Sequence, residues 1–358
     1  MKYEIEAFEV LVKDGYLKRA EKGDLVLYGY TDKTTFERAW QTKYTRDARG
    51  IILNKNTGEV VAKTFKKFFN LNEMEETQLK NLPNEQYEVF EKYDGSMGTA
   101  FFHDNDWHMA TRGSFTSEQA LRGLAILNKN YNISRLDPNC TYLVEIIYPE
   151  NKIIVDYGDK EMLVLLGVFH VPTGDELSFQ TVRCIAQVTG MPCAVQYFHT
   201  IEQMIELQKT MPKDEEGFVV RFESGLRVKI KGEEYMKIAK MISQMSPISF
   251  WESMENGKVK KDYLQQLPEE FRKEYEPMVE RLESLYEKTL FEIATEQTKL
   301  PITELKDRND RKNLGLYLSS GKHDLKHASV MFAVVLKQWE TVNSYIMKLI
   351  RPTGNVLS

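Results

Sequence analysis

The sequence predicts an α+β domain over residues 1–240, followed by an all-α domain over residues 241–358. Short apolar runs bounded by turn residues recur as far as about residue 231, and this pattern is typical of β-strands. Helix-start signals stand between several of these runs. From about residue 235 the strand signals stop, and apolar residues recur at helical spacing instead. This change of pattern favours two domains of different architecture.

The first half begins with a short amphipathic helix within residues 1–20, on which Ile5, Phe8 and Leu11 share a face. Strands are expected, in chain order, at residues 24–30, 50–53, 60–65, 87–90, 97–102, 142–147, 152–155, 162–169, 217–222 and 226–230. Helices are expected at residues 116–127, 181–188 and 200–207, the second of them ending at Gly190. The three runs between residues 142 and 169 are almost continuously apolar, which predicts burial on both faces.

The second half is expected to hold helices at residues 235–243, 248–254, 274–296 and 325–349. Its charge is uneven. Residues 261–310 carry 8 basic and 13 acidic side chains, a net −5, whereas residues 311–358 carry 7 and 2, a net +5. The basic end suits contact with an RNA backbone. Equally, the two halves could simply pair with each other.

Composition limits the possible functions. The chain has 358 residues and a net charge of −5, which argues against non-specific coating of nucleic acid but leaves room for a local basic cleft. Its three cysteines have no metal-ligand spacing, so a disulfide framework is not expected and a reducing cytoplasm is the natural location. No apolar run is long enough to cross a bilayer, and the N-terminus has no apolar signal core.

The stretch Glu91-Lys92-Tyr93-Asp94-Gly95-Ser96 lies between the strands expected at residues 87–90 and 97–102. Asp-Gly between two strand-like runs is a turn signal, so the sequence predicts a hairpin with Lys92 where the first strand leaves the core. A lysine placed there is partly desolvated, and its backbone is held firmly. The alternative is a hairpin whose lysine is merely solvated, and the short motif alone does not decide between the two.

Other charged residues stand on or beside expected strands. Glu145 lies inside an apolar strand, where a carboxylate is costly unless it is paired or faces a pocket. Glu216 directly precedes a strand, and Lys229 and Lys231 alternate along another, so both point to one face. Each has a plain alternative: the two lysines could line a solvated edge strand, and Glu145 could pair with a buried arginine. Arg49 and Lys67, taken singly, could be surface charges.

Taken in order, these residues resemble a known set. Lys-x-Asp-Gly at Lys92, a Glu in a strand at Glu145, Glu-Gly-hydrophobic at Glu216 and Lys-x-Lys at Lys229 form the motif order of the covalent nucleotidyltransferases. Three further segments make the chain similar to the RNA ligase 1 family of T-even-type bacteriophages: Arg49-Gly50-Ile51, Lys67 to Glu73, and Thr111 to Ser114. The resemblance runs from about Tyr28 to Lys231 and weakens in the helical tail. It implies a nucleotidyltransferase (ATP-grasp-like ligase) domain of antiparallel sheets with helices.

The resemblance also implies an activity, that of an ATP-dependent RNA ligase. Lys92 would attack the α-phosphate of ATP and carry AMP covalently. AMP would then pass to an RNA 5′-phosphate, and a 3′-hydroxyl would displace it. A free lysine has a pKa near ~10.4, so burial, neighbouring cations and a metal are expected to lower the pKa of Lys92. Mg²⁺ is the expected metal, with Mn²⁺ as a substitute.

Roles follow for the remaining residues of the family's motifs. In the catalytic set, Lys229 and Lys231 would neutralise the α-phosphate, and Asp94 would fix the turn. Glu145 would hold the ribose or a metal-bound water. Glu216 would orient Lys92 or bind the metal. The nucleotide-binding set comprises Arg49, Lys67 and Tyr30 on the β- and γ-phosphates, Arg112 near the ribose and phosphates, Leu166 and Val219 around the adenine, and Phe69 and Gly95 within the motifs. Asp262 is a candidate metal-proximal carboxylate in the helical domain.

The expected partner is RNA with 5′-phosphate and 3′-hydroxyl ends, in the family a broken tRNA anticodon loop, with the protein acting as a monomer. If the protein is phage-encoded, the cytoplasm is that of the host. The alternatives are a DNA ligase or capping enzyme, and a catalytically silent relative that only binds nucleotide or RNA. The first two normally carry a C-terminal β-barrel, which the helical tail counts against. The intact motif set counts against the third.

Overall fold

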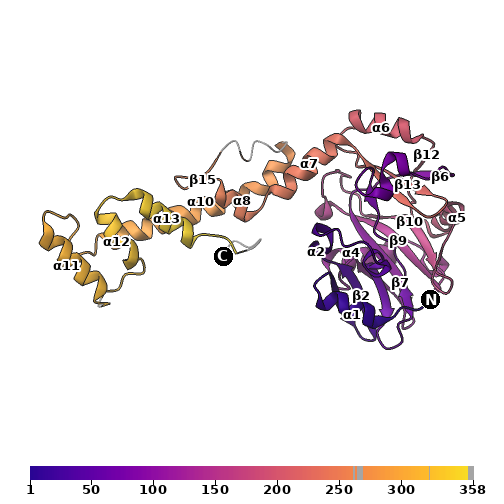
Figure 1. The fold of residues 1–358 in the computed structure, drawn as a ribbon, viewed down its shortest axis with the longest axis horizontal. Helices are drawn as coiled ribbons and strands as arrows, with labels where there is room; N and C mark the ends of the chain where they lie inside the picture. The colour runs from indigo at the N-terminus through magenta and orange to yellow at the C-terminus, as the bar shows by residue number, and fades with distance from the viewer. Residues whose placement is uncertain (261–262, 264–268, 322, 354–358) are drawn as a thin grey trace. The chain divides into compact units, whose positions relative to one another are not determined.

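The computed structural model describes residues 1–260, 263, 269–321 and 323–353. The chain divides into two compact units, Met1–Met236 and Lys237–Ser358. The first unit holds three sheets, and the second is built mainly of helices (Figure 1). Helix α7 (Glu233–Gln244) runs from the end of the first unit into the second.

The N-terminal sheet is antiparallel, and its strands follow in the order β1, β2, β3, β4. Their bounds are Leu17–Lys22, Leu25–Tyr30, Arg49–Asn54 and Val60–Ala62. Helix α1 (Ile5–Lys13) packs on this sheet through Phe8, whose ring stacks on Tyr28 with centroids 4.4 Å apart. The helix expected within residues 1–20 is shorter than predicted, because Gly15, at φ +79°, turns the chain and β1 begins at Leu17. Two short helices, α2 (Asp32–Phe36) and α3 (Lys43–Asp47), connect β2 to β3.

The second sheet has the order β11-β10-β9-β7-β8. Its strands span Asp175–Glu176, Met162–His170, Cys140–Ile147, Ser96–His103 and Asp106–Thr111. All eight residues of β9 are buried, as its continuous apolar run predicts. Helices α4 (Glu118–Asn130) and α5 (Phe179–Thr189) pack on this sheet; Ser117 caps the first, and left-handed Gly190 ends the second.

The third sheet has the order β12-β6-β13-β14-β5. Its strands span Gln196–Tyr197, Tyr87–Glu91, Gly217–Phe222, Arg227–Lys231 and Phe69–Asn70. Helix α6 (Ile201–Thr210), begun by a capping box at Thr200, covers one face through Met204 (Figure 1). The short 3₁₀ turns of this unit are η1 (Glu75–Thr77), η2 (Leu79–Asn81), η3 (Ile133–Arg135) and η4 (Pro149–Asn151).

The predicted hairpin around Lys92 is wrong. Strand β6 pairs with β12 and β13, whereas β7 pairs with β8 and β9, so the two strands belong to different sheets. Residues 92–95 are the crossing between those sheets. A local turn signal does not report long-range pairing, and here the partners of β6 lie more than 100 residues further along the chain.

Two other strand expectations fail in this unit, and β8 was not expected. Residues 152–155 form no strand, because the amides of Ile154 and Val155 donate to the Asp94 carboxylate instead of to a neighbouring strand. Strand β4 ends at Ala62, short of the expected residue 65. Strand β8 was not foreseen; its charged and polar first half hides the alternation.

The second unit contains α7 from Lys237 onward and helices with bounds α8 (Pro247–Glu252), α10 (Glu269–Gln297), α11 (Arg308–Ser319), α12 (Ala328–Val335) and α13 (Trp339–Leu349). A small hairpin, β15 (Met254–Glu255) with β16 (Lys258–Val259), departs from the all-α expectation. The single helix expected at 325–349 is two, broken where Lys337 adopts φ +57°. Helix α11 was not predicted. Across the described residues, the helices are too short or too polar to cross a bilayer.

Candidate active site

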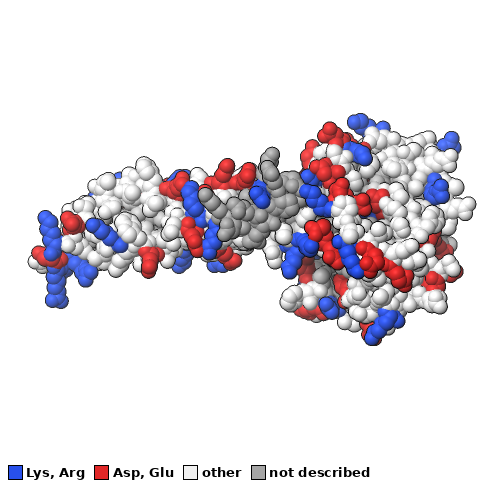
Figure 2. Space-filling view, turned by 90° about the horizontal axis from the view of Figure 1, so that it is seen from above, with Lys and Arg blue, Asp and Glu red and all other residues white. Residues whose placement is uncertain are grey.

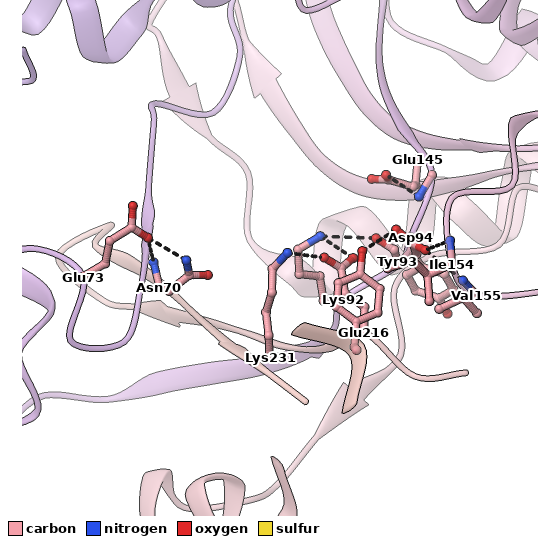
Figure 3. Close-up of polar contacts among 12 residues, drawn as sticks. Asn70, Glu73, Lys92, Tyr93, Asp94, Glu145, Ile154, Val155, Glu216 and Lys231 are labelled. Carbon is pink, nitrogen blue, oxygen red and sulfur yellow. Dashed lines mark hydrogen bonds and ion pairs between the residues drawn. The ribbon is translucent and has the colours of Figure 1, made fainter. Parts of the chain in front are cut away.

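Lys92 lies at the end of β6 and makes an ion pair with Glu216. Its Nζ is 2.6 Å from Glu216 Oε2, and Lys231 Nζ is 2.8 Å from Oε1 of the same carboxylate. Figure 3 shows both lysines pointing to this one side chain. Because Glu216 is 3% exposed, its charge is offset by the two ammonium groups rather than by solvent. The backbone adds a further link, since the Lys92 amide donates to the carbonyl of Gly217.

Gly217 explains why the motif needs a glycine after Glu216. Its φ is +135°, a conformation that other residues rarely adopt, and a Cβ there would lie 2.2 Å from the carbonyl oxygen of Ile230. The absence of a side chain lets β13 begin directly against β14, which brings Glu216 to Lys231. Glu216-Gly217 and Lys231 belong to two separate motifs of the sequence, and the pairing of Gly217 with Lys231 brings these motifs together.

Asp94 is a buried hydrogen-bonding hub rather than a group facing the cavity. Its Oδ2 accepts from the amides of Ile154 and Val155 at 2.8 and 2.9 Å, and its Oδ1 accepts from the hydroxyl of Tyr235 at 2.8 Å. The Tyr157 hydroxyl accepts from the Asp94 amide at 2.9 Å. These contacts fix the crossing that carries Lys92, so Asp94 acts as a positioning residue (Figure 3).

Glu145 projects from β9 toward the same region. Its Oε1 accepts from the Gly95 amide at 3.1 Å, and a Cβ on Gly95 would lie 2.7 Å from the carbonyl oxygen of Ile146, so glycine is required for this approach. Burial raises the pKa of Glu145 to about 7, although Lys92 and Arg49 act in the opposite direction. The carboxylate is therefore short of positive charge in the free protein.

Four cations gather beside the lysine pair: Arg49, Lys67, Arg112 and Lys229, which we call the cation cluster. Arg49 is half-buried, and its Nη1 atom is buried without a hydrogen-bond partner among the described residues. Burial, followed by the charges of Lys67 and Arg49, lowers the pKa of Lys229 to about 7. An unpaired buried donor and a lysine that holds its proton weakly both indicate a site built for an anion.

Aromatic rings hold the cation cluster in place. The Phe68 ring centre is 4.8 Å from the Arg49 guanidinium and 5.1 Å from Lys229 Nζ. Lys67 Nζ lies 5.1–5.3 Å from the ring centres of Tyr30, Trp40 and Phe69.

Tyr30 and Phe69 join this cluster in different ways. Arg112 donates to the Tyr30 hydroxyl at 3.0 Å. Burial alone would raise the pKa of Tyr30, but the charges of Lys67, Arg112 and Arg49 lower it overall. Phe69, 2% exposed, packs edge-on against Trp40, so it supports the cluster from the core instead of facing a ligand.

A cavity of about 190 Å³ opens from the lysine pair between the second and third sheets; we call it the main cavity. Of the residues predicted to act, it is lined by Lys92, Glu145, Lys229, Lys231, Arg49, Leu166 and Val219. Leu166 reaches it because β10 bulges between Leu165 and Gly167. Lys67 and Phe69 line a neighbouring groove. Asp262 lies outside the described residues.

Aromatic side chains that the sequence analysis did not include line the main cavity. They are Phe65, Phe68, Phe90 and Phe179, in addition to the predicted Leu166 and Val219. These rings come from separate segments: the strand-less stretch after β4, strand β6 and helix α5. The signal available in the sequence is the pair Phe68-Phe69 in the Lys67 motif, of which Phe68 rather than Phe69 faces the cavity.

The lowered pKa of Lys229 predicts a gain in stability when its charge is removed. The unfolded chain keeps this proton up to about pH 10.4, whereas the folded chain releases it near pH 7, so this group's contribution to stability rises with pH between those values. Lys229→Met should raise the free energy of unfolding at pH 6 by roughly 2 kcal/mol, and the gain should vanish toward pH 10. Urea unfolding at both pH values measures it. The exposed Lys129→Met is the control; an equal effect in both variants would refute burial as the cause.

Comparison with known proteins matches residues 47–235 to the model of a family of RNA ligases, of the T4 RNA ligase 1 type. A Thermovibrio ammonificans protein named "Putative RNA ligase" is 28% identical over 240 residues, which cover 64% of this chain and 62% of that protein. An Autographa californica nuclear polyhedrosis virus protein, "Putative bifunctional polynucleotide kinase/RNA ligase", is 25% identical over 248 residues, covering 63% of this chain and 35% of that protein. The match thus spans about three fifths of the first relative and a third of the second.

Two solved structures share the fold. An archaeal ATP-dependent RNA ligase superposes with a TM-score of 0.52 at 14% identity, covering 89% of this chain and 96% of that one. An Aquifex aeolicus protein described as a "Putative ATP-dependent DNA ligase" gives 0.50 at 18% identity, covering 89% of each chain. At such identities the likeness shows the nucleotidyltransferase fold alone. The family model covers more than half of the chain, and the protein therefore belongs to the RNA ligase family.

Proposed function

We propose that this protein is an ATP-dependent RNA ligase that joins a 5′-phosphate to a 3′-hydroxyl and carries AMP on Lys92. One observation carries the proposal: Lys92 and Lys231 converge on the buried Glu216 at the end of the main cavity. Family membership supports the same reading. A surface lysine in a chance motif would be solvated, whereas this one is anchored beside a cavity lined by Arg49, whose Nη1 has no partner among the residues that the structure describes.

In the first step, Lys92 Nζ, as the free amine, attacks the α-phosphorus of ATP. A P–N bond forms, the bond from that phosphorus to the bridging oxygen of pyrophosphate breaks, and the leaving pyrophosphate keeps the electron pair. The nitrogen is positively charged once the P–N bond has formed, and it gives up a proton to solvent. Glu216, at 2.6 Å from Nζ, holds the nucleophile in position, and Lys231 on the same carboxylate keeps that position from shifting.

The cation cluster would receive the triphosphate. Lys229, on the same face of β14 as Lys231, is placed to neutralise charge that builds on the α-phosphate, and the triphosphate would in turn restore its proton. Arg49 has a free buried donor for the β- or γ-phosphate. Lys67, Arg112 and Tyr30 extend the same role, since their contacts within the described part of the chain are with one another and with aromatic rings rather than with carboxylates.

The residues also fit a divalent metal. The pKa of Glu145 is raised to about 7 because burial leaves its charge uncompensated, and a nearby cation would relieve this. Glu145 is the side chain that would hold Mg²⁺, or Mn²⁺ in its place, together with water. Glu216, which the family resemblance also suggested as a metal ligand, already has an ammonium group on each carboxylate oxygen, at 2.6 and 2.8 Å. Such an ion would supply charge neutralisation for the phosphates.

Two further steps complete the reaction. An oxygen of the RNA 5′-phosphate attacks the phosphorus held on Lys92; the P–N bond breaks, the lysine regains a proton and an RNA-adenylate forms. The 3′-hydroxyl of a second RNA end then attacks the 5′-phosphorus, a phosphodiester bond forms, and AMP leaves. Lys92 is thereby returned to its starting state.

We infer separate roles for the two units: residues 1–240 as the adenylyltransferase domain and residues 241–358 as a helical domain that helps select RNA, with a broken tRNA anticodon loop as the candidate substrate. Basic side chains gather at the end of the second unit that carries α11 (Figure 2). Part of the basic half is neutralised, since Lys326 pairs with Glu292 of α10 at 2.8 Å. The proposed RNA contacts therefore rest on α11.

The test uses a 5′-phosphorylated single-stranded RNA incubated with the protein, ATP and Mg²⁺. The expected products are circular or joined RNA that resists phosphatase, together with AMP and pyrophosphate. A nicked duplex DNA serves as the competing substrate. Sealing of the DNA without sealing of the RNA would contradict the RNA assignment, and use of GTP in place of ATP would indicate a capping activity.

A further inference from the structure

The far end of the main cavity, away from Lys92, is lined by three charged side chains, those of Arg221, Arg227 and Glu176. Strands β13 and β14 pair Gly217 with Lys231, then Val219 with Lys229, then Arg221 with Arg227. Side chains of alternate residues share a face, so Arg227, Lys229 and Lys231 all point to the cavity side, and all three line it. At about 3.4 Å per residue, Arg227 lies about 14 Å along the strand from Lys231.

This spacing sets the direction of a bound nucleotide. With the α-phosphate at Lys92 and Lys231, the ribose and base extend along the ladder over Val219, toward Arg221 and Arg227. The rings of Phe65, Phe90 and Phe179 line that part of the cavity. The edge of the base then reaches the cross-strand pair Arg221–Arg227, the third of the three pairs named above.

Glu176, from the second sheet, makes ion pairs with both Arg221 and Arg227. It stands on β11 and lines the cavity, and its side chain is 14% exposed. Arg227 donates to Glu176 Oε1, and Arg221 Nη1 lies 3.3 Å from the same oxygen. Among the described contacts, both ion pairs fall on Oε1, so Oε2 retains its capacity to accept a hydrogen bond.

The surroundings fix Glu176 firmly. The Arg227 guanidinium lies 4.3 Å from the ring centre of Phe65, which orients it toward Glu176. That ring occupies space that only a glycine leaves: a Cβ on Gly167 would lie 2.7 Å from its tip. Arg227 and Phe65 are therefore positioning residues for the carboxylate.

We propose that Glu176 accepts a hydrogen bond from the exocyclic amine of adenine and so selects ATP over nucleotides that lack this amine. Purine riboside triphosphate has no group at that position, and inosine triphosphate has a carbonyl oxygen, which a carboxylate repels. Loss of a hydrogen bond to a buried charged acceptor leaves that acceptor unsatisfied. The inference rests on the proposed use of ATP and adds the residue that reads its base.

The test measures nucleotide binding by calorimetry in EDTA, where no adenylylation occurs. The wild-type protein should bind ATP about tenfold to a hundredfold more tightly than purine riboside triphosphate. Glu176→Gln, whose amide oxygen can still accept from Arg227, should reduce this ratio to about twofold and improve binding of inosine triphosphate relative to ATP. Asp175→Asn removes an adjacent, exposed carboxylate and should keep the wild-type ratio.

Two results would overturn the proposal. The first is that the wild-type protein binds ATP and purine riboside triphosphate equally well, a result that does not depend on the folding of any variant. The second is that Glu176→Gln keeps the wild-type ratio of the two affinities while its melting temperature is also that of the wild type. Because binding is read without chemistry, failure of the ligase function would appear separately, as the absence of an adenylylated protein. Even if no adenylylated protein forms, the role of Glu176 is supported when the wild-type protein prefers ATP and Glu176→Gln does not.

Discussion

Lys92→Ala is expected to abolish the covalent attachment of AMP to the protein. Incubation of the wild-type protein with α-labelled ATP and Mg²⁺ should leave label on the denatured chain, and the variant should carry none above background. The reason is chemical: without the Lys92 amine, the nitrogen that forms the P–N bond is missing. The acid lability of the adduct identifies the P–N bond.

The same experiment includes two checks. Lys129→Ala removes an exposed lysine at the end of α4 and should label like the wild type. Pre-adenylylated RNA bypasses the first step, so Lys92→Ala should still seal it to a measurable extent. Undiminished labelling of Lys92→Ala would mean that another residue is the nucleophile, and the account of the site would fail.

Glu216→Gln is expected to have the second-largest effect. The substitution keeps the size of the side chain but removes the charge shared by Lys92 and Lys231, so the two ammonium groups lose their common partner. We expect the single-turnover rate of adenylylation to fall by about a hundredfold or more. Breaking a buried ion pair should also lower the free energy of unfolding by about 3 kcal/mol.

The matched control is Glu215→Gln, one residue earlier and exposed. It should change the rate by less than about twofold and the stability by less than about 0.5 kcal/mol. If Glu216→Gln and Glu215→Gln had the same adenylylation rate and the same stability, the ion pairs at Glu216 would contribute nothing to catalysis or folding. Rate and stability are measured separately so that simple unfolding of Glu216→Gln is not mistaken for a catalytic defect.

Some of this site follows from local sequence alone. The alternation of Lys229 and Lys231 predicts a shared strand face, and both side chains line the main cavity from β14. Glu145 inside an apolar run predicts a carboxylate that is paired or faces a pocket, and its side chain lines the main cavity. Helix limits at Ser117, Gly190 and Thr200 were also predictable, because capping depends on neighbouring residues.

The remainder depends on contacts between distant segments. Asp-Gly after β6 has the form of a hairpin turn, but the Asp94 carboxylate binds amides 60 residues away and the chain crosses to another sheet. The same contact removes the strand expected at residues 152–155. Glu176, on a two-residue strand, carries no local signal, since its role comes from Arg227 and Arg221 across the cavity.

The central claim is that AMP becomes attached to Lys92, and peptide mapping tests it most directly. The protein is incubated with ATP and Mg²⁺, digested under alkaline conditions that preserve a P–N bond, and analysed by mass spectrometry. We expect one modified peptide, which contains residues 91–96 and is heavier by one adenylyl group on Lys92. An adenylyl group on Lys229, Lys231 or any other residue, with Lys92 unmodified, would contradict it.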